Sequence, residues 1–385
     1  MNYNNTKRAC YMSYIGTAIA NNLAPLLFVI FMDSFGYSYT QIGAMIFINF
    51  MTQLTVDALS VRFLDKIGYR TATVTGNICV MLGLIMMGTM AQFGYFALVL
   101  AAVVYGLGGG LLEVTVSPII ESLPLDEKSG QMSLLHSFYC WGQVLVVAVT
   151  TVVIKLFGTG VWRYLCCAWA IIPALTSLLF TKVPLDESLS SDEHSGFFGL
   201  FKHKFFVFAL LMMMSAGASE LVMAQWVSAF AERAMGISKF VGDLTGSCLF
   251  AVFMGTVRAL YGFFSEKIKI IPALTASAAL CVVCYLVSGL SYSATVSLLA
   301  CALTGIGVAL MWPCMLSLSS ERIPDGGTAM FAMLALFGDM GCAFGPWLTG
   351  VVADSGLGLN AGILCGVIFP VIMLIGLFAV KKCRS

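Results

Sequence analysis

Two stretches of the chain, about half its length apart, share an acidic–basic core. The first is Val61–Arg70, with the sequence VRFLDKIGYR, and the second is Gly262–Lys269, with the sequence GFFSEKIK. Asp65 and Glu266 are 201 positions apart. Other residues repeat at offsets of 199 or 200: Gly36 and Ser38 return as Gly236 and Ser238, and the GLG of 106–108 returns as the GIG of 305–307. A near-constant offset indicates a duplicated unit, in which each copy places this stretch in a loop between apolar segments.

The composition is that of a membrane protein. Of 385 residues, 59% are hydrophobic and 10% are charged, whereas soluble globular proteins carry about 25% charged residues. A net charge of +1 gives no reason to expect a nucleic-acid partner. The first apolar stretch is too long for a signal peptide and contains Asn21 and Asn22, so we expect a retained helix.

Twelve apolar stretches are long enough to cross a bilayer, which takes about 20 residues of helix. They are predicted at 10–32, 39–63, 73–93, 95–120, 131–156, 162–182, 205–231, 240–264, 271–290, 294–318, 327–351 and 359–380. We therefore expect an all-α membrane protein with two six-helix bundles, over 1–182 and 205–385, and a cytoplasmic linker over 183–204.

Basic residues predict which side of the membrane each loop faces, because they concentrate on the cytoplasmic side. With the N-terminus inside, fifteen fall on cytoplasmic segments: Lys7, Arg8, Arg62, Lys66, Arg70, Lys128, Lys182, Lys202, Lys204, Lys267, Lys269, Arg322, Lys381, Lys382 and Arg384. Four fall on outer segments, Lys155, Arg163, Arg233 and Lys239. Both termini are therefore expected in the cytoplasm.

Acidic residues inside the predicted spans are candidates for proton coupling. A charged side chain at bilayer depth costs about 2.5–3.5 kcal/mol, so each one needs a reason to be there. Glu113, Glu220 and Asp339 are the candidates. Ser117 and Glu121 follow Glu113 at helical spacing and continue its face toward the cytoplasm. The alternative for Glu113 is a permanently neutral side chain that hydrogen-bonds a neighbouring helix.

Polar and aromatic residues near the middle of the spans are candidates for substrate binding, because paired halves of carriers usually surround a central site. Amides and carboxylates bind hydroxyl groups, and aromatic faces cover C–H surfaces, so the set suits a small polyhydroxylated solute. The predicted residues are Asn21, Asn22, Glu113, His136, Tyr139, Glu220, Gln225, Trp226, Trp312 and Asp339. For a single amide, hydrogen bonding between helices is the alternative, and for a single tryptophan it is core packing.

A third group of residues is predicted to control conformation. Arg258 follows Asp57 by 201 positions, so opposite charges occupy equivalent places in the two halves and form a gating pair or neutralise local fields. Asp65 lies in a loop at the membrane face, where an acid can dock on a helix N-terminus. The predicted gating residues are Asp57, Arg62, Asp65, Arg70, Arg258 and Glu266.

Twelve spans, the repeat and the DKIGYR sequence of 65–70 together resemble the major facilitator superfamily. Further segments are similar to those of one group within it: ANNL at 20–23, GLG at 106–108 with Leu112-Glu113 and Ser117-Pro118, LHSFYCWG at 135–142, Trp312-Pro313 through Leu318, and 346–354. By these segments the chain most resembles the fucose/glucose/galactose–proton symporter group. The first-span aspartate of the group is replaced by Pro25, and Val61 stands where a glycine is usual.

The resemblance implies a fold, an activity and some residue roles. Glu113 matches the glutamate implicated in proton coupling and sugar binding, and His136 and Tyr139 fall at polar site positions. The chain is thus expected to be a monomeric carrier in the cell membrane that moves a sugar or sugar derivative by proton symport. It is expected to bind no cofactor and no metal, with protons as the coupling ion, and to have no enzymatic activity.

Two alternatives stay open. A proton-driven efflux antiporter for amphipathic organic compounds would use the same buried acids. A membrane-embedded sensor or enzyme is disfavoured, because the spans contain no HExxH or GxSxG motif and no soluble output domain follows them.

Overall fold

The computed structural model describes residues 3–123, 128–185, 200–201, 203–264, 268–323 and 327–382, and all the regular elements in these ranges are helices. Within them, eleven segments are long and apolar enough to span a membrane. The last, Met333–Val380, has 48 residues, more than twice the length that one crossing needs. It turns back at Gly356 and Gly358, which have φ angles of +89° and +76°. It therefore supplies two crossings, which agrees with the expected all-α fold of twelve spans.

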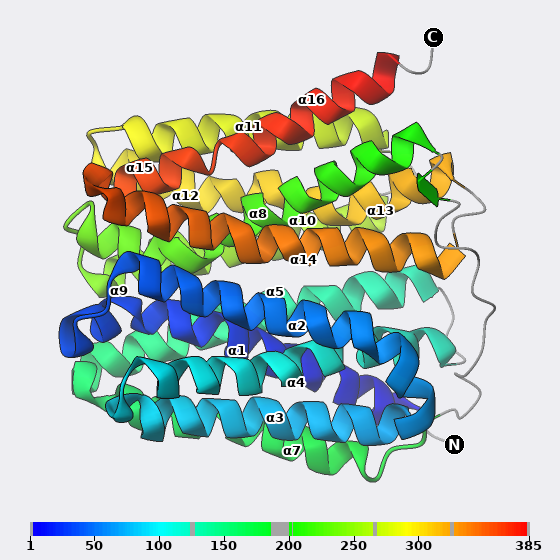
Figure 1. The fold of residues 1–385 in the computed structure, drawn as a ribbon, viewed down its shortest axis with the longest axis horizontal. Coiled ribbons are helices and arrows are strands. Elements are labelled where there is room, and N and C mark those ends of the chain that lie inside the picture. Colours follow the sequence, from blue (N-terminus) through cyan, green and yellow to red (C-terminus); the bar gives the residue numbers. More distant parts are fainter. Residues whose placement is uncertain are drawn as a thin grey trace. The chain divides into compact units, whose positions relative to one another are not determined.

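Contacts divide the chain into two compact units, Met1–Ser38 with Ile48–Ser191, and Tyr39–Phe47 with Asp192–Ser385. In the first unit, long helices lie side by side (Figure 1). Their bounds are α1 Asn4–Phe35, α2 Tyr39–Ile67, α3 Tyr69–Met90, α4 Tyr95–Ser122, α5 Lys128–Phe157, α6 Trp162–Trp169 and α7 Ile171–Phe180. The predicted loop at 61–70 is shorter than expected, because α2 continues to Ile67 and only Gly68 separates it from α3.

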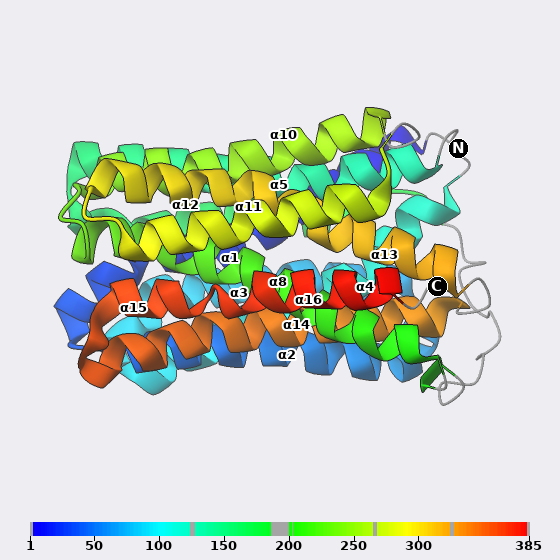
Figure 2. The same cartoon turned by 90° about the horizontal axis from the view of Figure 1, so that it is seen from above.

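In the second unit the same order of packing returns. Its helices are α8 Lys204–Arg233, α9 Lys239–Gly242, α10 Leu249–Phe264, α11 Ile270–Leu290, α12 Ala294–Ala309, α13 Met311–Arg322, α14 Gly327–Val352, α15 Gly358–Cys365 and α16 Ile368–Lys382. A π-helical turn, Asp243–Cys248, joins α9 to α10. The pairs α8–α14 and α11–α12 pack as α1–α5 and α3–α4 do in the first unit, and α10, α11 and α12 run lengthwise beside one another (Figure 2).

Apart from the span that contains the π-helical turn, three predicted spans are broken, and a proline follows each of these breaks. Proline has no N–H to donate to the carbonyl four residues earlier, and its ring crowds that carbonyl. Pro173 follows the break between α6 and α7, Pro313 the break between α12 and α13, and Pro370 the break between α15 and α16. Pro25 and Pro118, in contrast, lie inside continuous helices.

The repeated glycine motif has one packing role in both units. Gly106 faces the backbone of Asn49 on α2, and Gly305 faces the backbone of Phe250 on α10, so closely that neither position has room for a Cβ atom. Asn49 and Phe250 are themselves 201 positions apart. The duplication therefore preserves a close helix crossing, which only glycine permits.

The first nine residues of α2, Tyr39–Phe47, belong to the second unit by their contacts. The Asp354 carboxylate accepts hydrogen bonds from the backbone N–H groups of Tyr39, at 3.1 Å, and Thr40, at 2.6 Å. An acid at a helix N-terminus satisfies N–H groups that have no partner within the helix. The ring of Phe47 also packs on Phe344 of α14.

Candidate functional site

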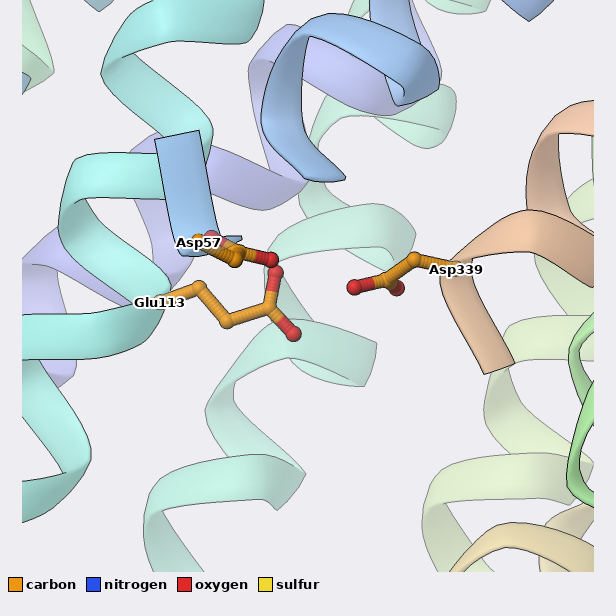
Figure 3. A group of neighbouring side chains, drawn as sticks. All are labelled: Asp57, Glu113 and Asp339. Carbon is orange, nitrogen blue, oxygen red and sulfur yellow. The ribbon is translucent and has the colours of Figure 1, made fainter. Parts of the chain in front are cut away.

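In the first unit, two acids face each other from neighbouring helices. Glu113 extends from α4 and Asp57 from α2, and their carboxylate oxygens lie within 4.8 Å of one another (Figure 3). Neither side chain is completely buried. Asp339, also labelled in Figure 3, belongs to α14 of the second unit and is described with that unit. The pair supplies two of the six to eight oxygen ligands that Ca²⁺ takes, so we assign no metal to it.

The acid pair belongs to a larger group of polar side chains, which we call the polar surface of the first unit. Its other members are Asn21, Asn22, Gln53, Tyr139, Tyr14 and Ser117. Gln53 Nε2 of α2 donates to Asn21 Oδ1 at 3.3 Å. Asn22 Nδ2 donates to the Ala18 carbonyl at 2.8 Å and lies 3.4 Å from the Tyr139 hydroxyl of α5. Both asparagines therefore hydrogen-bond within the protein, and Asn22 brings the predicted binding residue Tyr139 to the same surface.

Tyr14 is a residue of this surface that the sequence analysis missed. Its hydroxyl is 2.9 Å from Ser117 Oγ of α4, and its ring meets the His136 ring edge-on, with the centroids 5.3 Å apart. His136 is itself exposed in the described structure. Tyr14 precedes Asn21 by seven residues, two helical turns along one face of α1, and that spacing could have identified it.

In the second unit, the central feature is an ion pair between α8 and α10. Arg258 Nη2 lies 2.8 Å from Glu220 Oε2, and the two side chains keep 14% and 12% of their surface exposed. Arg258 Nε also donates to the carbonyl of Ala309 at 3.3 Å. Arg258 thus pairs with Glu220, an acid of its own unit, and compensates the negative charge of that side chain.

The other predicted binding residues of this unit differ in access. Trp226 is 0% exposed, and its indole N–H donates to the carbonyl of Pro346 at 2.9 Å, while Gln225 is also buried. The Trp226 ring therefore contributes to helix packing and offers no surface to a solute in this structure, whereas Gln225 is buried to the same extent as Asn22 and Gln53 of the first unit. Trp312, on α13, is partly exposed, and its ring lies against Gly338 of α14, next to the buried Asp339.

One predicted gating residue, Arg70, has a local role in the first unit. Its guanidinium donates to the carbonyls of Phe180, at 2.5 Å, and Val183, at 2.9 Å. These carbonyls lie at and just beyond the end of α7, where the helix leaves such groups without partners. The side chains of Arg62 and Asp65, and all of Glu266, lie outside the described residues.

Twelve apolar crossings in two units of matching packing, with acids and amides inside the spans, define a multi-pass membrane carrier rather than an enzyme. The family model of the Major Facilitator Superfamily matches residues 10–346, and the chain belongs to that family. No match was found among curated proteins.

Solved structures of transporters share the fold. A D-xylose–proton symporter superposes with a TM-score of 0.81 at 15% identity, over 97% of each chain. A single-substitution variant of the E. coli fucose–proton symporter has a TM-score of 0.66 at 16% identity over 100% of each chain. A structure of the fucose symporter in the outward conformation gives 0.65 at 15% identity, covering 99% of this chain and 98% of that one.

Proposed function

We propose that this carrier moves a sugar or sugar derivative together with a proton, by alternating access, across the cell membrane. The two halves expose a central site to each side of the membrane in turn, as two-repeat carriers do. Both termini face the cytoplasm in this proposal, on the basis of the fifteen-to-four distribution of basic residues.

The observation that carries the proposal is the polar surface of the first unit. Amides from α1 and α2, hydroxyls from α1, α4 and α5 and two carboxyl groups are gathered there from four helices. A solute with many hydroxyl groups both donates and accepts hydrogen bonds. This set of side chains supplies acceptors and donors for those bonds. Polar side chains at membrane depth are costly, which favours a functional role.

The similar solved structures support the same direction. They are named as proton symporters of D-xylose and fucose. At 15–16% identity the likeness is one of fold, and the binding screen below identifies the sugar.

Among the three acids predicted to carry the proton, we assign the role to Glu113. Glu220 has the permanent charge of Arg258 beside it, so its own charge is already compensated. Glu113 has a second acid, Asp57, as its neighbour, and two negative charges at this separation repel each other. One proton held by the pair relieves that repulsion, and its release as solute leaves would couple the two movements.

Binding is the first test. A thermal-shift screen of pentoses, hexoses and sugar acids on the purified protein identifies solutes that raise its melting temperature, because a ligand of the folded state stabilises it. Labelled forms of those solutes are then given to proteoliposomes with an inward proton gradient. Accumulation above the external concentration, abolished by a protonophore, supports the proposal.

The same screen tests the competing hypothesis, a proton-driven efflux antiporter. A set of amphipathic organic cations is included because buried acids would equally serve a proton-driven efflux antiporter. Stabilisation by these cations, with no response to any sugar and with transport in exchange for protons, would contradict the proposal.

A further inference from the structure

The break between α12 and α13 leaves a buried carbonyl without its helical donor. In a continuous helix the N–H of residue 313 would bond to the carbonyl of Ala309, but residue 313 is a proline. Ala309 is 0% exposed. A buried carbonyl without a donor is strongly unfavourable, so a group elsewhere in the protein is needed to satisfy it.

Arg258 supplies that group from α10. Its Nε donates to the Ala309 carbonyl at 3.3 Å, while its Nη2 binds Glu220 of α8 at 2.8 Å. The guanidinium is planar, permanently charged and has five N–H donors in a fixed fork, so it can make both contacts at once. One side chain therefore connects α8, α10 and the broken tenth span.

The break also decides where Trp312 lies, because this residue is the second of α13. The Trp312 ring packs so closely on Gly338 that no side chain would fit there. Asp339 is the next residue of α14. A shift of α13 at the break would move the indole ring away from this place.

We propose that Arg258 is a positioning residue, which fixes the Pro313 break through the Ala309 carbonyl, with Glu220 as its counter-ion, and thereby holds Trp312 against Gly338. This assignment concerns the second unit alone and is independent of which solute the carrier moves. It gives Glu220 and Arg258 a joint role different from proton transfer and from gating between halves.

The test uses a variant that leaves no stranded charge. In E220Q/R258Q both members of the pair are neutral, and the Ala309 carbonyl loses its charged donor. Amide hydrogen exchange of peptides covering 306–316 is expected to accelerate by about tenfold in the full-length protein, since exchange reports local opening. Acrylamide quenching of Trp312, obtained as the difference from a W312F version of each protein, is expected to rise.

The rescue is specific to the mechanism. Adding P313A to the double variant restores an N–H at residue 313, which can bond to the Ala309 carbonyl without Arg258. Exchange of 306–316 and quenching of Trp312 are expected to return to within about twofold of the parent values. The matched control is P173A, which restores an N–H at the α6–α7 break in the first unit and is expected to leave both readouts of the double variant unchanged.

Three results would overturn the proposal. These are unchanged exchange and quenching in E220Q/R258Q, no rescue by P313A, or equal rescue by P173A. If the double variant is not monodisperse, R258K takes its place, because an ammonium group keeps the charge beside Glu220 but lacks the planar fork. The proposal then requires faster exchange of 306–316 in R258K and its reversal in R258K/P313A, and parent-like exchange in R258K contradicts it.

Discussion

Equivalent positions of the two units carry opposite chemistry on the same scaffold. Asp57 of α2 corresponds to Arg258 of α10 at an offset of 201, and Glu113 of α4 corresponds to Trp312 of α13 at an offset of 199. The first unit therefore presents two acids where the second presents a base and an aromatic ring. The packing around them is shared, as the equivalent glycine contacts demonstrate.

This difference indicates which features of a duplicated carrier are kept in both halves and which diverge. Close helix crossings tolerate little change, because glycine alone permits them, so both copies retain the motif. The side chains that project from those helices can change freely. In our proposal the coupling acid is in the first unit, and at the equivalent positions the second unit has a permanent charge, Arg258, and an aromatic ring, Trp312.

The largest effect on stability is expected where the comparison is sharpest, at Asp57 and Arg258. R258A leaves the Glu220 carboxylate uncompensated in a largely buried place and should lower the free energy of unfolding by about 3 kcal/mol. D57N, at the equivalent position, removes a charge that repels Glu113 and should cost little or stabilise. Thermal and denaturant unfolding in detergent measure both, and equal losses would break the comparison.

A smaller and symmetrical effect is expected at the glycine crossings. G106A and G305A each force a methyl group against a neighbouring backbone, which should destabilise by about 1–3 kcal/mol. The same unfolding measurements apply, with G160A as a control, because a Cβ at Gly160 meets nothing within 4 Å. A large loss in one crossing and none in the other would show that the packing equivalence does not hold.

The smallest effect is expected at the starts of two equivalent helices, α2 in one repeat and α9 in the other. Asp354 caps α2 from a distant part of the chain, whereas Lys239 and Asp243 at the start of the second unit's helix pair locally at 3.0 Å. D354A should destabilise by about 1 kcal/mol, the usual cost of losing a helix cap. D354N keeps an acceptor oxygen and should cost less, so an equal loss in the two variants would contradict the capping role.

Sequence reasoning predicted the fold because span length and repeat offset are properties of the chain itself. It could not select the broken spans, since Pro313 and Pro118 look alike until neighbouring helices determine which carbonyls find other donors. The partner of Arg258 was equally hidden. Its acid lies 38 residues away on α8, and helix rotation alone decides that contact.

The candidate site was foreseen unevenly for the same reason. Amides and acids near mid-span pointed to the surface of the first unit, where α1, α2, α4 and α5 bring them together. Trp226 was predicted on equal grounds, yet its face of α8 packs on α14 and is completely buried. A single sequence indicates how deep a residue lies in the membrane, but it gives little information on which neighbouring helix the side chain faces.

The central claim is that the proton is carried in the first unit, and one measurement tests it directly. Glu113→Gln keeps the shape and hydrogen bonding of a protonated acid and removes its titration. In proteoliposomes with an inward proton gradient, the accumulation ratio of a transported sugar should fall to about 1, while exchange of labelled for unlabelled sugar persists, because exchange needs no net proton movement. D33N, which changes an exposed acid near the C-terminal end of α1, is the matched control and should accumulate like the parent. A Glu113→Gln carrier that still concentrates its sugar would contradict the account and return the coupling role to Glu220 or Asp339.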